Sequence, residues 1–237
     1  MIRLVYLRFI WNNHRGFALY SLFVMAILQF LIVRLVTTLD YAPIIMALLE
    51  QVPDRFRELL GENVASRLTV EGAAAFGFNH PLVLALLAIN AINIPNRHIA
   101  GEIETGTLEL LLAYPFKRIS LVLSLWTSSV LLLLLMIAGA LAVSLTAISL
   151  FHQLTWLLFT RMLQIGSNLW LLFVLITSIS MLISTFGKEG SKTGMRAAGI
   201  ILVFYLFYYL SSLWDVIEVT TNFNIFNYYQ PLGLMSG

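Results

Sequence analysis

The chain has 237 residues, of which 59% are hydrophobic and only 11% are charged, and its mean hydropathy is +0.88. Soluble domains are about 45–50% apolar and about 25% charged, so this composition excludes an ordinary soluble domain and indicates a membrane protein. The absence of cysteine excludes disulfides and thiolate metal sites, and a net charge of only +2 without a basic stripe argues against nucleic-acid binding.

Five apolar runs are long enough to cross a bilayer as helices, which takes about 20 residues. In chain order they are Phe17–Val36, Pro81–Ile99, Ser120–Leu150, Leu157–Phe186 and Ala197–Leu213. The third and fourth runs exceed the length of one span, so we expect them to tilt or to project beyond the hydrocarbon. The sequence therefore predicts an all-α fold: one polytopic transmembrane domain over residues 1–237, built as a helical bundle with five crossings.

Lysine and arginine residues predict the orientation, because they gather in the cytoplasmic connections of membrane proteins. One set of connections carries Arg3, Arg8, Arg15, Arg97, Lys117, Arg118, Lys188, Lys192 and Arg196. We therefore expect a cytoplasmic N-terminus and a cytoplasmic loop at residues 187–196. Residues 40–80 are then expected to form an external loop, and residues 214–237 a folded external segment rich in aromatic side chains.

The first 15 residues are expected to form a short helix that lies in the cytoplasmic membrane surface. Leu4, Leu7 and Trp11 share one helical face, and Arg8 and Arg15 lie on another. Such a pattern is typical of an interfacial helix, with aromatic rings at headgroup level. The alternative is ordinary positively charged sequence that flanks the first crossing.

Residues 100–118, here called the polar segment, lie between the second and third apolar runs. Gly106 supplies a flexible joint, and Thr107 is a plausible helix N-cap, with Glu109 in the first turn. Pro115 would end this short helix. Its apolar face would consist of Leu108, Leu111 and Leu112. By pattern alone, the helix could either dock onto a partner or pack on its own protein.

Two pairs of polar residues lie inside the predicted crossings. Asn90 and Asn93 are three residues apart, and Gln164 and Asn168 are four apart, so each pair is expected to share one helix face. One interpretation is a polar lining of a translocation path. The other, which we favour, is hydrogen bonding between helices, worth about 0.6 kcal/mol per bond on average.

The sequence contains no recognisable catalytic or metal-binding motif. The histidines appear scattered over different loops and crossing ends; they are His14, His80, His98 and His152. The run Gly187–Gly194 contains Gly, Lys, Ser and Thr, but Ser191 interrupts the spacing that a phosphate-binding loop requires. We therefore predict that the chain is not an enzyme and carries no metal or cofactor, and an intramembrane enzyme is a weak alternative.

The polar segment reads Gly-Glu-Ile-Glu-Thr-Gly-Thr-Leu-Glu-Leu-Leu-Leu from Gly101 to Leu112, followed by Pro115 and Arg118. This resembles the signature of the permease subunits of type-2 ABC exporters. In that family the segment is a cytoplasmic coupling loop whose short helix docks onto a separate ATPase. The resemblance assigns ATPase coupling to Glu102, Glu104, Gly106, Thr107, Leu108, Glu109, Leu111, Leu112 and Pro115.

The resemblance extends to residues 52–61, which look like the family's external segment after the first crossing, and to residues 227–231, which look like its approach to the last crossing. Members of the family have six crossings and a cytoplasmic C-terminus. This chain shows five apolar runs, so we expect either a five-crossing member or a sequence that continues beyond residue 237.

The resemblance also implies the partners and the location. Two copies of a cytoplasmic ABC ATPase would carry ATP and Mg²⁺, and a second permease copy or a related chain would complete the transporter. The location would be a bacterial or archaeal cytoplasmic membrane. The alternative function is a non-transport membrane anchor or signalling subunit that docks an ABC ATPase through the same loop.

Overall fold

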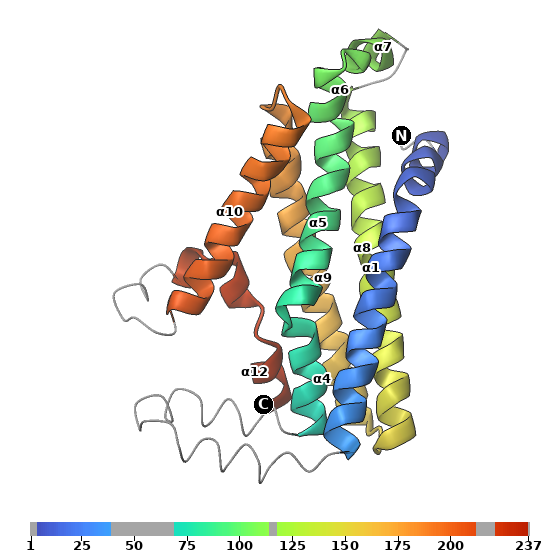
Figure 1. Ribbon diagram of the computed structural model, residues 1–237, viewed down its shortest axis with the longest axis vertical. Helices are drawn as coiled ribbons and strands as arrows, with labels where there is room; N and C mark the ends of the chain where they lie inside the picture. The colour runs from blue at the N-terminus through green and yellow to red at the C-terminus, as the bar shows by residue number, and fades with distance from the viewer. Residues whose placement is uncertain (1–3, 39–68, 114–117, 212–220, 237) are drawn as a thin grey trace. The chain divides into compact units, whose positions relative to one another are not determined.

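The computed structural model describes residues 4–38, 69–113, 118–211 and 221–236. Within these ranges all regular structure is helical, and no strand occurs (Figure 1). Five stretches of the described chain are long and apolar enough to cross a membrane. The predicted all-α fold with five candidate crossings is therefore confirmed.

Each of the five long helices overlaps one predicted apolar run. They are α1 (Leu4–Thr38), α5 (Pro81–His98), α8 (Arg118–Phe151), α9 (Trp156–Thr185) and α10 (Gly190–Ser211). With 34 and 30 residues, α8 and α9 are both longer than the roughly 20 residues that cross the hydrocarbon. Pro95 lies inside α5, and the helix continues past it for three residues.

Six short helical elements complete the described chain. They are α4 (Val70–Asn79), α6 (Ala100–Glu104), α7 (Thr107–Ala113), the 3-10 helices η1 (Thr221–Phe223) and η2 (Ile225–Tyr228), and α12 (Pro231–Ser236). The last three lie in the predicted external segment. They confirm that its residues 221–236 are folded, and residues 214–220 lie outside the described ranges.

The prediction of a separate surface helix over residues 1–15 is wrong in one respect. Helix α1 runs without a break from Leu4 to Thr38, so the N-terminal residues and the first crossing form one helix. This stretch contains no proline, and Gly16, at the expected junction, does not have a positive φ. A glycine inside a helix costs only about 1 kcal/mol, which does not end it.

The predicted external loop at residues 40–80 also needs correction, because its last part is helix α4. Thr69 caps this helix: its hydroxyl oxygen accepts the backbone N–H of Gly72 at 2.9 Å. The run of small side chains Ala73–Ala75 is buried. His80, with φ −64° and ψ 132°, separates α4 from α5, as expected for a residue before proline. Residues 40–68 lie outside the described ranges.

The predicted loop at residues 187–196 is shorter than expected. Helix α10 begins at Gly190, so Lys192 and Arg196 lie on its first two turns. The Glu189 carbonyl oxygen accepts both the backbone N–H of Thr193, at 3.0 Å, and its hydroxyl, at 2.7 Å. These bonds start the helix before the apolar run, which sequence hydropathy places seven residues later.

The chain divides into two compact units, and α1, α5, α8 and α9 contribute residues to both. The first unit comprises Met1–Ser21, Ala85–Met136 and Leu169–Tyr229. The second unit comprises Leu22–Leu84, Ile137–Asn168 and Gln230–Gly237.

In the first unit, indole N–H groups link α8 to α9. Trp126 donates to the Ser178 hydroxyl at 3.0 Å, and Trp170 donates to the Val130 carbonyl at 3.1 Å. Asn224 holds the segment after α10, because its amide donates to the Phe204 carbonyl at 2.8 Å. Each bond satisfies a polar group among apolar side chains, where an unpaired one would cost about 1–3 kcal/mol.

In the second unit, charged residues have specific partners. The Arg34 guanidinium lies 4.5 Å from the centre of the Phe151 ring, within the range of a cation–π interaction. A Glu71 carboxylate oxygen lies 3.5 Å from His152 Nε2, which makes an ion pair when the histidine is protonated. The Arg161 guanidinium donates to the Met235 carbonyl, which attaches α12 to α9.

Candidate functional site: the polar segment and the start of helix α10

The polar segment folds as two short helices joined at Gly106. Gly106 has a φ of 72°, and among the described residues no other has a positive φ. Only glycine adopts this backbone conformation without a steric penalty. The prediction that Gly106 forms a conformational joint is therefore consistent with the structure.

Hydroxyl groups close the turn between α6 and α7. The Thr107 hydroxyl donates to the Glu102 carboxylate, and the hydroxyls of Thr105 and Thr107 lie 2.8 Å apart. Thr107 is the first residue of α7 and not the residue before it, so the predicted N-cap is displaced by one position. Because its hydroxyl is engaged by Glu102, Thr107 ties α7 back to α6.

The start of α10 is bonded to the polar segment and to α5. The Gly190 N–H donates to Glu104 Oε2 at 2.8 Å, and the Gly190 carbonyl accepts the Asn96 amide N–H at 2.8 Å. A carboxylate at this position interacts favourably with the positive end of the helix dipole. In Figure 1, α6 lies beside the first turn of α10.

The same contact depends on the absence of a side chain at Gly190. A Cβ atom added to Gly190 would lie 3.3 Å from the Cα of Gly101 and 3.4 Å from its nitrogen. Backbone atoms cannot move aside as a flexible side chain can, so the absence of a side chain at Gly190 allows α6 and α10 to approach this closely.

Helix α7 carries exposed side chains at its centre. Glu109 is exposed, and Leu110 is 67% exposed, whereas Leu108 is half-buried. The predicted apolar face included Leu108, Leu111 and Leu112 but not Leu110. The side chains of Leu111 and Leu112, and the whole of Pro115, lie outside the described part of the structure.

Two of the histidines that appeared scattered in the sequence are in contact. His14 Nε2 of α1 and His98 Nε2 of α5 lie 3.0 Å apart, and both side chains are buried. The edge of the Phe9 ring approaches His98, with centroids 6.0 Å apart. The described residues contain no group of three or more His, Cys, Asp or Glu side chains that could hold a metal ion.

Comparison with protein families decides the classification. The family model described as ABC-2 family transporter protein matches residues 13–235. The chain belongs to this family. It is a membrane component of an ABC-2 transporter with multiple spans, and this permease domain is a non-catalytic subunit, as the polar segment predicted. Neither the curated proteins nor the solved structures gave a match.

Family membership implies an ATPase partner in general, because the permease itself does not hydrolyse ATP. The energy for an ABC-2 transporter is therefore supplied outside this chain. In the described permease, the polar segment offers both an exposed helix and a bonded connection to a long helix.

The two members of each predicted polar pair of the permease differ in burial. Asn90 is buried and its amide donates to the Ser21 hydroxyl at 3.2 Å and to the Leu86 carbonyl at 2.8 Å, while Asn93 is exposed. The bond from Asn90 to Ser21 joins α5 to α1, as the helix-packing interpretation expects. Gln164 is exposed and Asn168 is half-buried.

The buried position of Gln29 in the permease was not predicted from the sequence. Gln29 of α1 is wholly buried, and neither its amide nitrogen nor its amide oxygen has a hydrogen-bond partner. Its side chain lies over Gly77 of α4, where an added Cβ atom would collide with it. A glutamine in the middle of the first apolar run was the available sequence signal.

Proposed function

We propose that this permease is the membrane subunit of an ATP-driven exporter and forms its translocation path. Two copies of a cytoplasmic ABC ATPase bind ATP and Mg²⁺, and a second copy of the permease, or a related chain, completes the transporter. The observation that carries the proposal is the bonded junction of Glu104 and Asn96 with Gly190. It supports a path for movement from a docking helix to a long apolar helix.

The proposal gives the two short helices different roles. Helix α7, with Leu110 exposed, docks onto the ATPase, and burial of this side chain in the contact removes apolar surface from water. Helix α6 transmits the displacement, because Glu104 attaches it to the first residue of α10. Glu102 and Thr107 keep the two helices together during this movement.

The roles can be separated by two substitutions. Leu110→Asp should abolish co-purification of the ATPase that accompanies the wild-type permease, because a carboxylate cannot be buried in an apolar contact without a large cost. Glu104→Gln should retain the ATPase but weaken the attachment to α10. Glu189→Gln is the matched control, since Glu189 is an exposed carboxylate near the same helix start and, among the described residues, pairs with Lys192.

Movement of α10 can be followed with a single introduced cysteine, because the chain has none. Ser191, at the start of α10, is exposed, so Ser191→Cys should react readily with a maleimide. Trapping the ATPase with ATP and vanadate should change this labelling rate in the wild type and in Glu189→Gln, but not in Glu104→Gln. An unchanged rate in the wild type, with the ATPase bound, would contradict export and favour a membrane anchor.

The orientation is part of the proposal and has its own test. A cytoplasmic polar segment requires Thr105→Cys to react with an impermeant maleimide only after the cells are permeabilised. Gln153→Cys, in the exposed connection between α8 and α9, should react in intact cells. Labelling of Thr105→Cys from outside would overturn both the orientation and the docking role of α7.

A further inference from the structure

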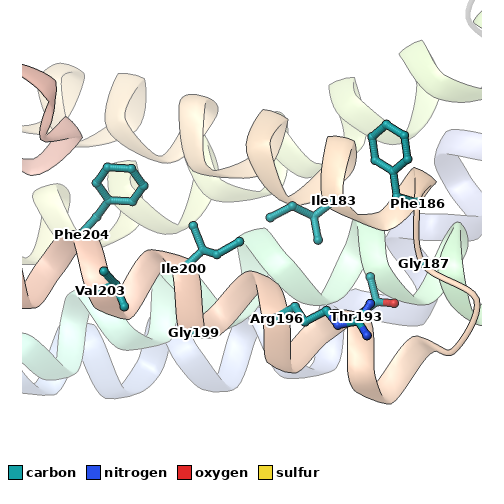
Figure 2. A pocket seen from close by; sticks show the side chains of 9 residues that line it. All are labelled: Ile183, Phe186, Gly187, Thr193, Arg196, Gly199, Ile200, Val203 and Phe204. Atoms are coloured by element: carbon teal, nitrogen blue, oxygen red, sulfur yellow. The ribbon is translucent and has the colours of Figure 1, made fainter.

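A groove of about 630 Å³ lies between the end of α9 and residues 193–204 of α10 (Figure 2). This volume is in the range of about 300–1,000 Å³ that is typical of ligand sites. Most of its walls are apolar; they comprise Ile183, Phe186, Ile200, Val203 and Phe204. Figure 2 shows Ile183 and Phe186 on one side and the α10 side chains on the other.

One charged side chain, Arg196, lines this groove. Arg196 shares a face of α10 with Ile200 and Val203, four and seven residues further on. It is exposed, and it makes no ion pair within the part of the chain that the structure describes. In Figure 2 its guanidinium extends toward Thr193, that is, toward the first turn of α10.

The position of Arg196 makes an unpaired charge costly. It is the seventh residue of a candidate membrane span, about 9 Å along the helix from Gly190 at 1.5 Å per residue. Charged residues inside such spans are rare and usually have a partner. A long side chain that extends toward the helix start can bring its charge to the headgroup level while its stem stays among apolar groups.

Gly199 keeps the groove open beside Arg196. A Cβ atom added at Gly199 would meet no other atom within 4 Å, so the space in front of this residue is free. A side chain added at this position would therefore begin in free space beside the groove.

We propose that the groove binds an anionic phospholipid, with its phosphate on Arg196 and one acyl chain along Ile183, Ile200 and Val203. A guanidinium binds a phosphate through two parallel hydrogen bonds, and the apolar walls suit a hydrocarbon chain. A lipid supplies its phosphate at the headgroup level, within reach of this side chain.

The test is native mass spectrometry of the full permease purified in detergent and given equal amounts of phosphatidylglycerol and phosphatidylcholine. The wild type should retain the anionic lipid about fivefold more than the zwitterionic one, as expected for one basic contact. Arg196→Lys should keep most of this preference, and Arg196→Gln should lose it. Arg118→Gln, at the exposed first residue of α8, is the matched control and should bind as the wild type does.

Filling the groove gives a second, independent measurement. Gly199→Phe should reduce the total amount of retained lipid, while the oligomeric state and the melting temperature of the protein stay unchanged. Equal retention of both lipids by the wild type, or an unchanged preference in Arg196→Gln, would overturn the proposal. A change of oligomeric mass in Gly199→Phe without loss of lipid would also overturn it, and would identify the groove as a protein interface. None of these results depends on ATPase docking.

Discussion

The two parts of α10 differ in how the rest of the first unit holds them. At its first residue, Gly190, two hydrogen bonds and a close backbone approach fix the helix to α6 and α5. Further along, the face that carries Arg196 and Gly199 borders an open groove. Of the five candidate spans, the one formed by α10 has the smallest buried share.

This difference indicates a helix that is fixed by hydrogen bonds at its start and lightly packed along the face that borders the groove. Directional bonds at Gly190 define where α10 starts and which way its first turn points. The apolar contacts beyond it are few, so small displacements there cost little packing energy. Such an arrangement suits a helix that responds to movement of the polar segment.

The largest effect is expected where both attachments are removed together. The double substitution Asn96→Ala with Glu104→Ala should lower the free energy of unfolding by about 2 kcal/mol, because each bond contributes about 1 kcal/mol. Thermal unfolding in detergent measures this loss. Asn93→Ala with Glu109→Ala removes the same two side-chain types from exposed positions and should change stability far less. Equal melting temperatures for the two double variants would refute a fixed start of α10.

A single added methyl group should distinguish Gly190 from Gly199 in α10. Gly190→Ala places a Cβ atom 3.3 Å from the Gly101 backbone and from Glu104 Oε2, so we expect a loss of about 1 kcal/mol. Gly199→Ala enters free space and should be neutral or slightly stabilising, since alanine favours a helix more than glycine does. Melting temperatures that fall equally in both variants would show that α10 is packed alike at Gly190 and at Gly199.

The smallest effect is expected for the exposed ion pair at the same helix start. Lys192 Nζ lies 2.7 Å from a Glu189 carboxylate oxygen, but the side chains are 65% and 51% exposed. Exposed pairs contribute about 0–1 kcal/mol. Lys192→Gln should therefore change the melting temperature hardly at all, and less than Gly190→Ala does. A larger loss than that of Gly190→Ala would mean that charge pairing, and not the Gly190 contacts, holds this end.

The sequence predicted the features that depend on local properties. Hydropathy is summed along a run of residues, so the crossings at α8 and α9 could be located to within a few residues. A glycine between two short polar stretches indicated a joint at Gly106, and this residue has a φ of 72°. The residue sequence of the polar segment also resembled the ABC-2 permease signature, and the family comparison confirmed that family over residues 13–235.

Helix boundaries set by hydrogen bonds or small-residue packing were harder to predict. Val70–Asn79 is short and rich in glycine and alanine. It forms helix α4 because Thr69 caps it and its small residues are buried. The start of α10 precedes its apolar run because Glu189 and Glu104 bond to the first turn. Sequence hydropathy depends on neither helix caps nor hydrogen bonds between distant residues, so it could not predict these boundaries.

By itself the sequence determined the class of the protein, its five candidate crossings and the polar segment between α5 and α8, because apolar length and local residue order suffice for these. Only the tertiary structure decided that Glu104 bonds to Gly190 and that His14 meets His98, across 86 and 84 residues of chain. Only the tertiary structure also separated buried Asn90 from exposed Asn93. Such contacts depend on which helix faces meet, and a single sequence carries no periodic signal for residues that far apart.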